Sequence, residues 1–231
     1  MREIVLDTET TGLHADQGDR VVDIGCVELI NHRPSGKVYH QYINPERGMD
    51  SEALAVHGIT NEFLQDKPKF NEIADDFLAF IGDDPLIIHN APFDIGFLNM
   101  ELSKVDRPLL SMERVIDTLV MARKKYPGSQ VNLNALCKRF NVDLSKRTVH
   151  GALVDCELLA DVYFSMILDT ELKIQPIEKK EKKISLKNVS RETLPPRKFE
   201  ISEEELAAHN AFIEKIKDNL WTAEPPKETE K

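Results

Sequence analysis

The sequence predicts an α/β fold, a mixed β-sheet flanked by helices, followed by a flexible C-terminal tail. Three observations support this prediction. Short apolar segments rich in β-branched residues come first and are followed by helical and strand-like segments in turn. All 10 glycines lie within residues 1–170, where they mark turns between segments. From Lys173 to Lys198 the periodic pattern stops, in a lysine-rich stretch with no glycine and a Pro-Pro pair.

The N-terminal region begins with three predicted strands, at residues 2–8, 21–30 and 37–43, because each is short and rich in β-branched residues. A helix is expected at 69–82, where apolar residues recur at helical spacing on one side. The apolar run at 85–90 is predicted to be a short buried strand. This order of strands and helices indicates one mixed sheet.

Helices make up the rest of this region. One is expected from about 92 to 105, because the proline at its start suits the first turn of a helix. Two more are expected at about 115–125 and 132–140, the second with Asn132 as its N-cap. A long final helix at 151–168 has apolar residues at helical intervals.

The chain therefore divides into three parts, an α/β domain, a flexible basic linker and a tail: 1–170, 171–198 and 199–231. In the tail, Ser202 followed by Glu205 is typical of a capping box, so a helix is expected from there to about Trp221. Its apolar side would be Leu206, Ala207, Phe212, Ile213 and Ile216.

The formal net charge of −10 is carried entirely by residues 1–170, which hold 17 of the 30 basic and 27 of the 40 acidic residues. An acidic domain argues against binding of a phosphate backbone by a basic face alone. Clustered carboxylates can nevertheless bind divalent metals, which reverse the local sign of the charge. Nucleic acid therefore stays possible as a substrate.

The composition excludes several other classes of protein. With 41% hydrophobic and 30% charged residues the chain is typical of a globular protein, and no apolar run is long enough to span a membrane. Acidic residues in the first apolar stretch argue against a signal peptide, so a cytoplasmic location is expected. The 3 cysteines, Cys26, Cys137 and Cys156, form no CxxC pair, which excludes a disulfide scaffold and a zinc ribbon.

The strongest chemical signal is the segment DTETTG at the end of the first predicted strand. Side chains two residues apart on a strand project from the same face, so Asp7 and Glu9 are expected side by side. Two carboxylates that close repel each other, and a divalent cation such as Mg²⁺ or Mn²⁺ would compensate. The alternative interpretation is a solvated strand end followed by a glycine turn.

Two further acids and a histidine follow later in the chain. Asp94 is expected in the first turn of a helix after a buried strand, where it could equally stabilise the helix dipole. His150 and Asp155 lie about 140° apart around a continuous helix, and so cannot share one face. If both serve one site, His150 lies in the loop before the helix and Asp155 in its second turn. The alternative is a loop histidine and an unrelated acid near a helix start.

These residues and their surroundings resemble the DEDD superfamily of 3′–5′ exonucleases in its histidine-bearing branch. The chain is particularly similar to the epsilon-subunit family of bacterial DNA polymerase III, the proofreading exonucleases. The matching stretches cover nearly all of 1–166 and about 197–221. They include IVLDTETTGL, EALAVHGIT, LIIHNAPFDIGF, HGALVDCELLADVY and EEELAAHNA. The resemblance implies a ribonuclease H-like fold for the α/β domain.

The resemblance implies a chemical role for each matching residue. Asp7, Glu9 and Asp155 correspond to the family's direct ligands of two divalent metal ions, Mg²⁺ or Mn²⁺. Asp94 corresponds to the family's fourth acid, and His150 to its general base. With two metals to neutralise charge, such a site hydrolyses phosphodiesters in spite of its acidic surroundings.

The resemblance also implies a substrate site. Glu52 and His57 match positions that contact the terminal nucleotide, together with the three metal-binding acids. Thr10, Leu13 and Phe93 lie where members of the family hold the 3′-terminal bases. The implied substrate is a single-stranded or frayed 3′ DNA end, from which mismatched deoxynucleotides leave as mononucleotides.

The implied partner is the polymerase alpha subunit, bound through the C-terminal tail that ends near Trp221. The segment at Gln175 lacks the aromatic anchor of the family's clamp-binding motif, which argues against a contact with the sliding clamp. No membrane partner is expected.

Two alternatives stay open. A stand-alone exonuclease that trims RNA or oligonucleotides would use the same five chemical residues, although it would need no tail. A non-catalytic replisome tether would keep the fold without the chemistry, although all five of these residues are present.

Overall fold

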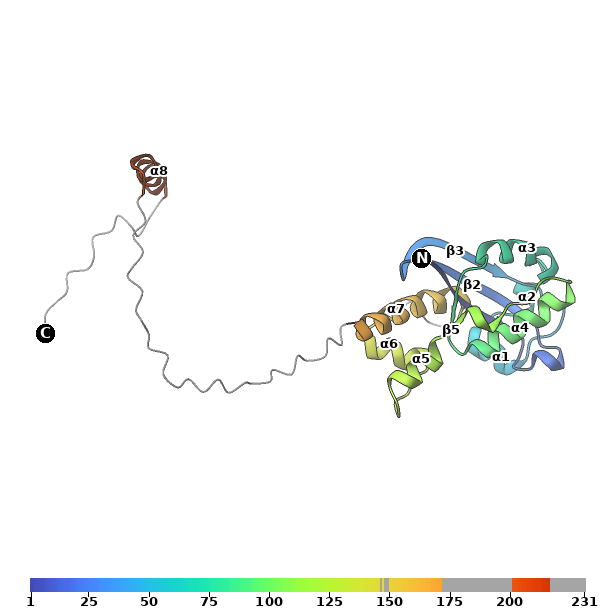
Figure 1. Ribbon diagram of the computed structural model, residues 1–231. Coiled ribbons are helices and arrows are strands. Elements are labelled where there is room, and N and C mark those ends of the chain that lie inside the picture. The colour runs from blue at the N-terminus through green and yellow to red at the C-terminus, as the bar shows by residue number, and fades with distance from the viewer. Residues whose placement is uncertain (146, 148–149, 172–200, 217–231) are drawn as a thin grey trace. The chain divides into compact units, whose positions relative to one another are not determined.

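The computed structural model describes residues 1–145, 147, 150–171 and 201–216. The chain divides into two units, Met1–Glu178 and Lys179–Lys231. The first unit holds a five-stranded sheet with helices on both faces (Figure 1), so the predicted α/β class is confirmed. Most of the predicted linker, and Trp221, lie outside the described residues. Within the described part of the chain, no helix is long and apolar enough to cross a membrane.

The sheet is mixed, with the strand order β3-β2-β1-β4-β5. The central strand β1 (Arg2–Thr10) pairs antiparallel with β2 (Val21–Ile30), which pairs antiparallel with β3 (Arg33–Tyr42). On its other side β1 pairs parallel with β4 (Leu86–Ile88), which pairs parallel with β5 (Val115–Asp117). The carboxyl ends of β1, β4 and β5 therefore meet at one edge of the sheet, where α/β proteins place their sites.

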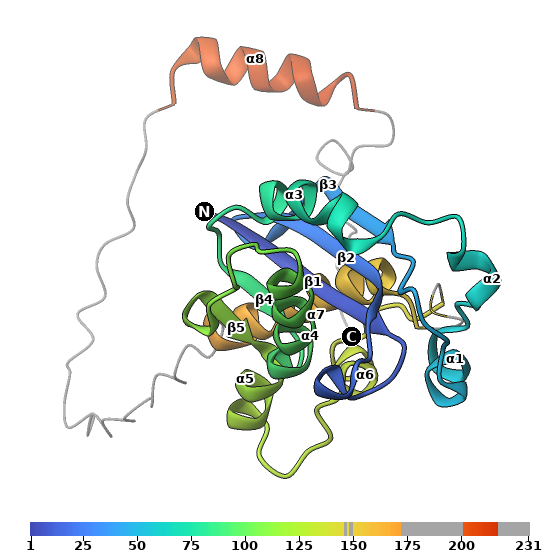
Figure 2. The ribbon, with the colours of Figure 1, turned by 90° about the vertical axis from the view of Figure 1, so that its right-hand side faces the viewer.

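Helices cover both faces because β1 alternates its apolar side chains between them. Ile4 and Leu6 pack in the core with α3 and α4, and Val5 packs on the opposite face with α7. Figure 2 shows α4 in front of the sheet and α7 behind it. The helices are α1 (Ser51–His57), α2 (Asn61–Leu64), α3 (Phe70–Ile81), α4 (Ala91–Lys104), α5 (Thr118–Lys125), α6 (Leu133–Phe140), α7 (Ala152–Glu171) and, in the second unit, α8 (Glu203–Ile213), with 3-10 turns at Ala15–Gln17 and Met112–Arg114.

Most elements of the first unit lie close to where the sequence places them, with four corrections. The strand predicted at 37–43 begins four residues earlier, at Arg33. The predicted helix at 115–125 begins only at Thr118, since its first three residues form the short edge strand β5. The helices α1 and α2 were not expected, because 7 and 4 residues are too few for a clear period. Asp155 lies in the first turn of α7 and not in the second, because the helix begins one residue later than predicted.

The tail helix is shorter than expected. The capping box is present, since the Ser202 Oγ accepts a hydrogen bond from the Glu205 backbone N–H at 3.3 Å. The described helix ends at Ile213, and none of its residues is buried. Leu206 and Phe212, on the predicted apolar side, are 51% and 64% exposed.

The N-terminus of α7 lies unusually close to β2. A Cβ atom on Gly25 would stand 2.4 Å from the Ala152 carbonyl carbon, so no other residue fits at this position without moving the helix. The Asp23 carboxylate accepts a hydrogen bond from the Ala152 N–H at 3.1 Å, and the Cys156 Sγ donates to the Gly25 carbonyl at 3.1 Å. These contacts set the place of the first turn of α7, which carries Asp155.

Candidate active site

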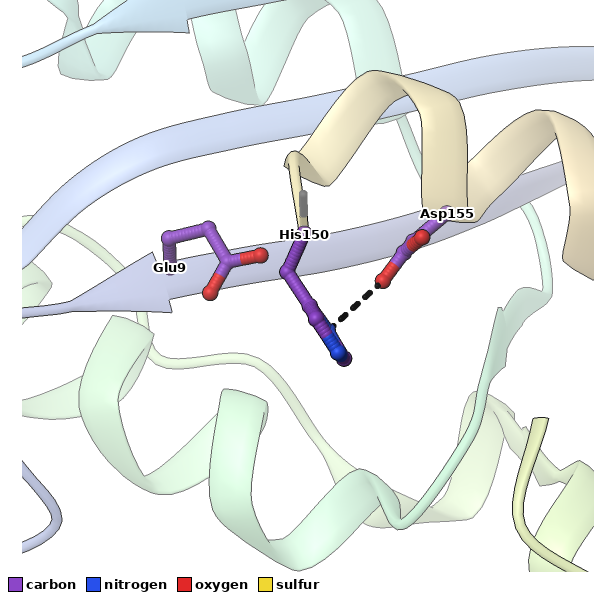
Figure 3. A group of neighbouring side chains, drawn as sticks. All are labelled: Glu9, His150 and Asp155. Carbon is purple, nitrogen blue, oxygen red and sulfur yellow. Dashed lines mark ion pairs between the residues drawn. The ribbon is translucent and has the colours of Figure 1, made fainter. Parts of the chain in front are cut away.

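The five residues predicted to carry the chemistry come together at the carboxyl edge of the sheet. Asp7 and Glu9 lie on β1, Asp94 in the first turn of α4 and Asp155 in the first turn of α7. His150 lies in the segment before α7, as expected. One possible ligand atom from each of Glu9, His150 and Asp155 lies within 4.8 Å of the others (Figure 3). Three segments that are far apart in the sequence supply these residues, at 7–9, 94 and 150–155.

Asp94 is held by the strand beside it and is only 3% exposed. Its Oδ1 accepts hydrogen bonds from the Thr8 N–H at 3.0 Å and the Thr8 hydroxyl at 2.7 Å. Thr8 points to the α4 face of the sheet while Asp7 and Glu9 point to the α7 face, as the strand period requires. The threonine between the two acids therefore ties the fourth acid to the same strand end.

Asp117, at the end of β5, positions α4 and was not singled out from the sequence. Its Oδ2 accepts a hydrogen bond from the Ala91 N–H at 3.2 Å, and its Oδ1 one from the Asn90 N–H at 3.3 Å. The same carboxylate caps α5 by accepting from the Leu119 N–H at 2.8 Å. One side chain thus fixes the starts of two helices, including the one that carries Asp94. Asp117 is a residue type typical of an N-cap, but the helix was predicted to begin at 115, so this signal was not recognised.

Arg147 is the second residue that the sequence reasoning missed. Its guanidinium pairs with both oxygens of Asp155, Nε with Oδ1 and Nη2 with Oδ2, each at 2.5 Å. Its Nη2 also lies 2.8 Å from the His150 Nδ1, and its Nη1 donates to the Asn134 Oδ1 at 2.5 Å. Arg147 and Asp155 are nearly buried, with side chains 7% and 6% exposed. In this structure Arg147 is therefore the cation that compensates Asp155.

Burial and mutual repulsion hold protons on the other carboxylates. Burial raises the pKa of Asp7 well above its ordinary value, and the neighbouring Asp94, Glu9 and Asp155 add to the rise. Burial, followed by repulsion from Asp155, raises the pKa of Glu9 to about 8. Burial raises the pKa of Asp94 to about 7, although the hydrogen bonds from Thr8 oppose it. These three carboxyl groups therefore stay partly or largely protonated near pH 7, because the buried site does not accommodate all of their negative charge at once.

The donor set fits a hard divalent cation. Carboxylate oxygens with one imidazole are the ligands that Mg²⁺ and Mn²⁺ accept, and a bound cation would replace the protons that these acids hold. Among the described residues, Glu9, His150 and Asp155 form the group whose ligand atoms are close enough to hold one ion, and Asp7 is near enough to Glu9 and Asp155 for their charges to interact. Burial lowers the pKa of the His150 imidazole, and the charge of Arg147 lowers it further, so this histidine is mostly neutral near pH 7.

A cavity of about 380 Å³ opens beside this cluster. It is lined by the predicted substrate residues Glu52, His57, Thr10, Leu13 and Phe93, and by Glu9 from the cluster. Glu52 is exposed on α1, and Leu13 is 68% exposed at the cavity mouth. The cavity thus joins the acidic cluster to two apolar side chains, a combination that suits a charged group attached to a flat ring.

His57 is a buried residue at the end of α1. Its Nδ1 accepts a hydrogen bond from the Ile59 N–H at 3.0 Å, so its Nε2 carries the hydrogen and faces the Thr10 carbonyl at 3.3 Å. Burial lowers the pKa of His57, which keeps the ring neutral. Nε2 therefore holds α1 against the end of β1, at the wall of the cavity, while Nδ1 fixes the turn that follows α1.

Comparison with known proteins places this site in a family. The family model described as Exonuclease matches residues 4–163. Exonuclease X, solved in complex with 5′ overhanging duplex DNA, is 26% identical with a TM-score of 0.57, over 73% of this chain and 93% of that chain. The nuclease domain of 3′hExo bound to rAMP has a TM-score of 0.63 at 18% identity, over 73% and 92% of the two chains, and shares the fold. By fold and site the protein is an exonuclease.

Relatives along the full sequence narrow this class. The DNA polymerase III subunit epsilon of Rickettsia conorii is 50% identical over 227 residues, which are 94% of this chain and 96% of that protein. The subunit epsilon of Escherichia coli is 40% identical over 237 residues, 96% of this chain and 98% of that protein. The chain belongs to the family of DNA polymerase III epsilon subunits.

The first prediction concerns the stability of the metal-free protein. The folded pKa of Glu9, about 8, lies above its ordinary value of 4.5, so the folded state binds this proton more tightly than the unfolded state. The stability that the proton contributes is fully present below about pH 4.5 and is lost as the pH rises through about 8. In EDTA at high pH, the free energy of unfolding of Glu9→Gln should therefore exceed that of wild type by about 1–3 kcal/mol. At about pH 5 the two free energies of unfolding should be similar.

Urea unfolding followed by circular dichroism measures this difference. The control is Glu157→Gln, which changes an exposed acid on α7 and should follow wild type at both pH values. If wild type and Glu9→Gln lost stability equally between the two pH values, the result would contradict a raised pKa of Glu9 in the folded protein.

Proposed function

We propose that the chain is the proofreading 3′–5′ exonuclease subunit of a replicative DNA polymerase, which hydrolyses mismatched 3′-terminal deoxynucleotides to mononucleotides. The observation that carries the proposal is the convergence of Asp7, Glu9, Asp94, His150 and Asp155 at one sheet edge, beside a cavity of about 380 Å³. Membership of the epsilon family supports the choice of DNA as substrate.

Asp7, Glu9 and Asp155 would hold two divalent metal ions, Mg²⁺ or Mn²⁺, with Asp94 as the fourth acid of the site. Bound there, such ions would supply the positive charge that an anionic phosphodiester needs on both sides of its attacked phosphorus. The raised pKa values of Asp7, Glu9 and Asp94 support this assignment, because burial, with repulsion between neighbouring acids at Asp7 and Glu9, disfavours their charged forms, which a bound cation would stabilise.

His150 takes the proton of the attacking water. Its ring is largely neutral near pH 7, and a neutral imidazole has one nitrogen free to accept a proton. Two groups compete for its Nδ1, the Arg147 Nη2 at 2.8 Å as a donor and the Asp155 Oδ2 at 3.3 Å as an acceptor. Only when Nδ1 carries the hydrogen is Nε2 free to act as the base. Arg147 must therefore leave Nδ1 before catalysis.

The cavity holds the 3′-terminal nucleotide. Glu52 and the wall formed by His57 and Thr10 contact the nucleotide, and the apolar side chains of Leu13 and Phe93 stack on its base. The acids Asp7, Glu9 and Asp155 then lie on the phosphate side. A terminal base that is already unpaired enters at a lower cost than a paired one, which favours frayed ends.

The tail tethers the exonuclease to the polymerase alpha subunit. The helix at Glu203–Ile213 has a complete capping box and exposes Leu206 and Phe212, which are suitable anchors for a groove on a partner. Residues 171–198 act as the linker, which keeps the exonuclease at high local concentration near the polymerase. The proposed role in replication implies a cytoplasmic location for the protein.

The direct test uses the full chain with single-stranded DNA or RNA labelled at its 5′ end. Mononucleotide release from DNA should require Mg²⁺ or Mn²⁺ and stop in EDTA. Asp7→Asn or Asp155→Asn should lower the rate by about 10³-fold or more, since several kcal/mol of charge stabilisation is lost. Circular dichroism should show that both variants keep the fold. A strong preference for RNA would instead support an RNA-trimming enzyme, and metal-independent or absent release would contradict the proposal.

A second assay isolates the base. His150→Gln should lower the rate of release by about 10²–10⁴-fold, the usual contribution of a positioned general base, and should remove the acidic limb of the pH–rate profile. A metal titration should still show binding. Another group would be the base if the limb persisted in the variant.

A truncation tests the tether. A chain that ends after Thr170 should release nucleotides from single strands at nearly the rate of the full chain, because the described site lies entirely before that point. It should no longer co-purify with the polymerase alpha subunit. The tether assignment would fail if residues 1–170 bound that subunit as tightly as the full chain did.

A further inference from the structure

The charge of the domain is distributed unevenly on a local scale. Residues 119–149 hold seven basic residues and one acidic residue, whereas the rest of 1–170 holds 10 basic and 26 acidic residues. A segment of about 30 residues is thus strongly positive inside a strongly negative domain. The domain's net charge conceals this difference.

The fold gathers this segment into one place. The helices α5 and α6 both pack on α7 (Figure 1), through the buried residues Ala122, Leu136, Cys137, Leu158, Val162 and Met166. The ends of the two helices also meet, since the Arg139 guanidinium lies 4.4 Å from the centre of the Tyr126 ring and that ring lies 6.1 Å from Phe140. The apolar sides of α5 and α6 are therefore covered, and their basic residues face outward.

Four of these side chains are exposed and form what we call the basic lobe, Arg123, Lys124, Lys138 and Arg139. No carboxylate of the described residues forms an ion pair with any of the four. Lys125 is different, because it pairs with Asp169 and is largely buried. The basic lobe thus presents positive charge that the described part of the protein does not neutralise.

The part of the basic lobe on α6 is linked to the active site through Asn134. A polar hollow on α6 is lined by Gln130, Asn132, Asn134, Ala135, Lys138 and Arg139. Asn134 at the near end of this hollow accepts the hydrogen bond from Arg147, which pairs with Asp155. Lys138 lies one helical turn further along the same side of α6. A chain of polar and basic groups therefore leads outward from the catalytic acids.

We propose that the basic lobe binds the phosphodiester backbone of the DNA strand whose 3′ end is in the active site. This inference rests on the proposed function and adds to it a second, upstream contact with the substrate. A protein with a net charge of −10 repels a polyanion at long range, and a local positive surface beside the site offsets that repulsion. The amide side chains of the hollow suit phosphate oxygens, which they contact without regard to sequence.

The test compares a long and a minimal substrate in the full chain. The triple variant Arg123→Gln/Lys124→Gln/Lys138→Gln removes three exposed charges that touch no catalytic residue. Its KM for a single strand of about 20 nucleotides should rise about tenfold at low salt, and the slope of log KM against log salt should fall by about 2. Hydrolysis of the p-nitrophenyl ester of thymidine 5′-phosphate, which has no upstream strand, should stay at the wild-type kcat and KM.

The matched control is Lys104→Gln, an exposed lysine at the opposite end of α4 from Asp94. It should keep the wild-type KM and salt slope on both substrates. A triple variant with the wild-type salt slope would overturn the basic lobe as a DNA contact, and would point to an acidic protein as its ligand. An equal loss on both substrates would also overturn it, because the change would then act on the active site. If wild type cleaved neither substrate, the proposed function itself would fail.

Discussion

The close placement of four carboxylates on a rigid sheet edge is the constraint on which the rest of the structure depends. Carboxylates that close repel each other, and burial adds the cost of removing them from water. A flexible loop would relieve this repulsion by moving the groups apart. Here β1 is the central strand, its Ile4, Val5 and Leu6 are fully buried, and it is paired on both sides, so Asp7 and Glu9 cannot separate.

Contacts around the site also fix the positions of its acidic residues. Thr8 holds Asp94, Asp117 holds the start of α4, and Asp23 with Gly25 holds the start of α7. Each of these residues contacts backbone or a neighbouring acid and lies outside the group predicted to carry the chemistry. Apolar packing on both faces of the sheet stabilises the fold and so offsets the cost of holding these carboxylates close together.

Local patterns were enough to predict the main elements and the positions of the acids. The strand period placed Asp7 and Glu9 on one face. The five-residue spacing placed His150 in the loop before α7 only on the condition that it shares a site with Asp155, and the resemblance to the exonuclease family supplied that condition. What failed depended on contacts between distant segments or on elements too short to show a period. The edge strand β5 and the contact of Asp117 with the start of α4 are of this kind. The Arg147–Asp155 pair is local, but it depends on how the loop before α7 folds back on the helix, which no periodic pattern describes. The roles of Glu52 and His57 stay predictions, although both line the cavity.

The most direct test of the account is the number of protons released when Mn²⁺ binds, measured by titration calorimetry in buffers of different ionisation enthalpy. With the pKa of Glu9 at about 8 and that of Asp94 at about 7, the metal-free site holds roughly one proton or more at pH 7. Mn²⁺ binding should therefore release at least about one proton per chain at pH 7, and markedly fewer at about pH 9. Tight Mn²⁺ binding without proton release at pH 7 would contradict the claim that burial and mutual repulsion keep protons on these carboxylates.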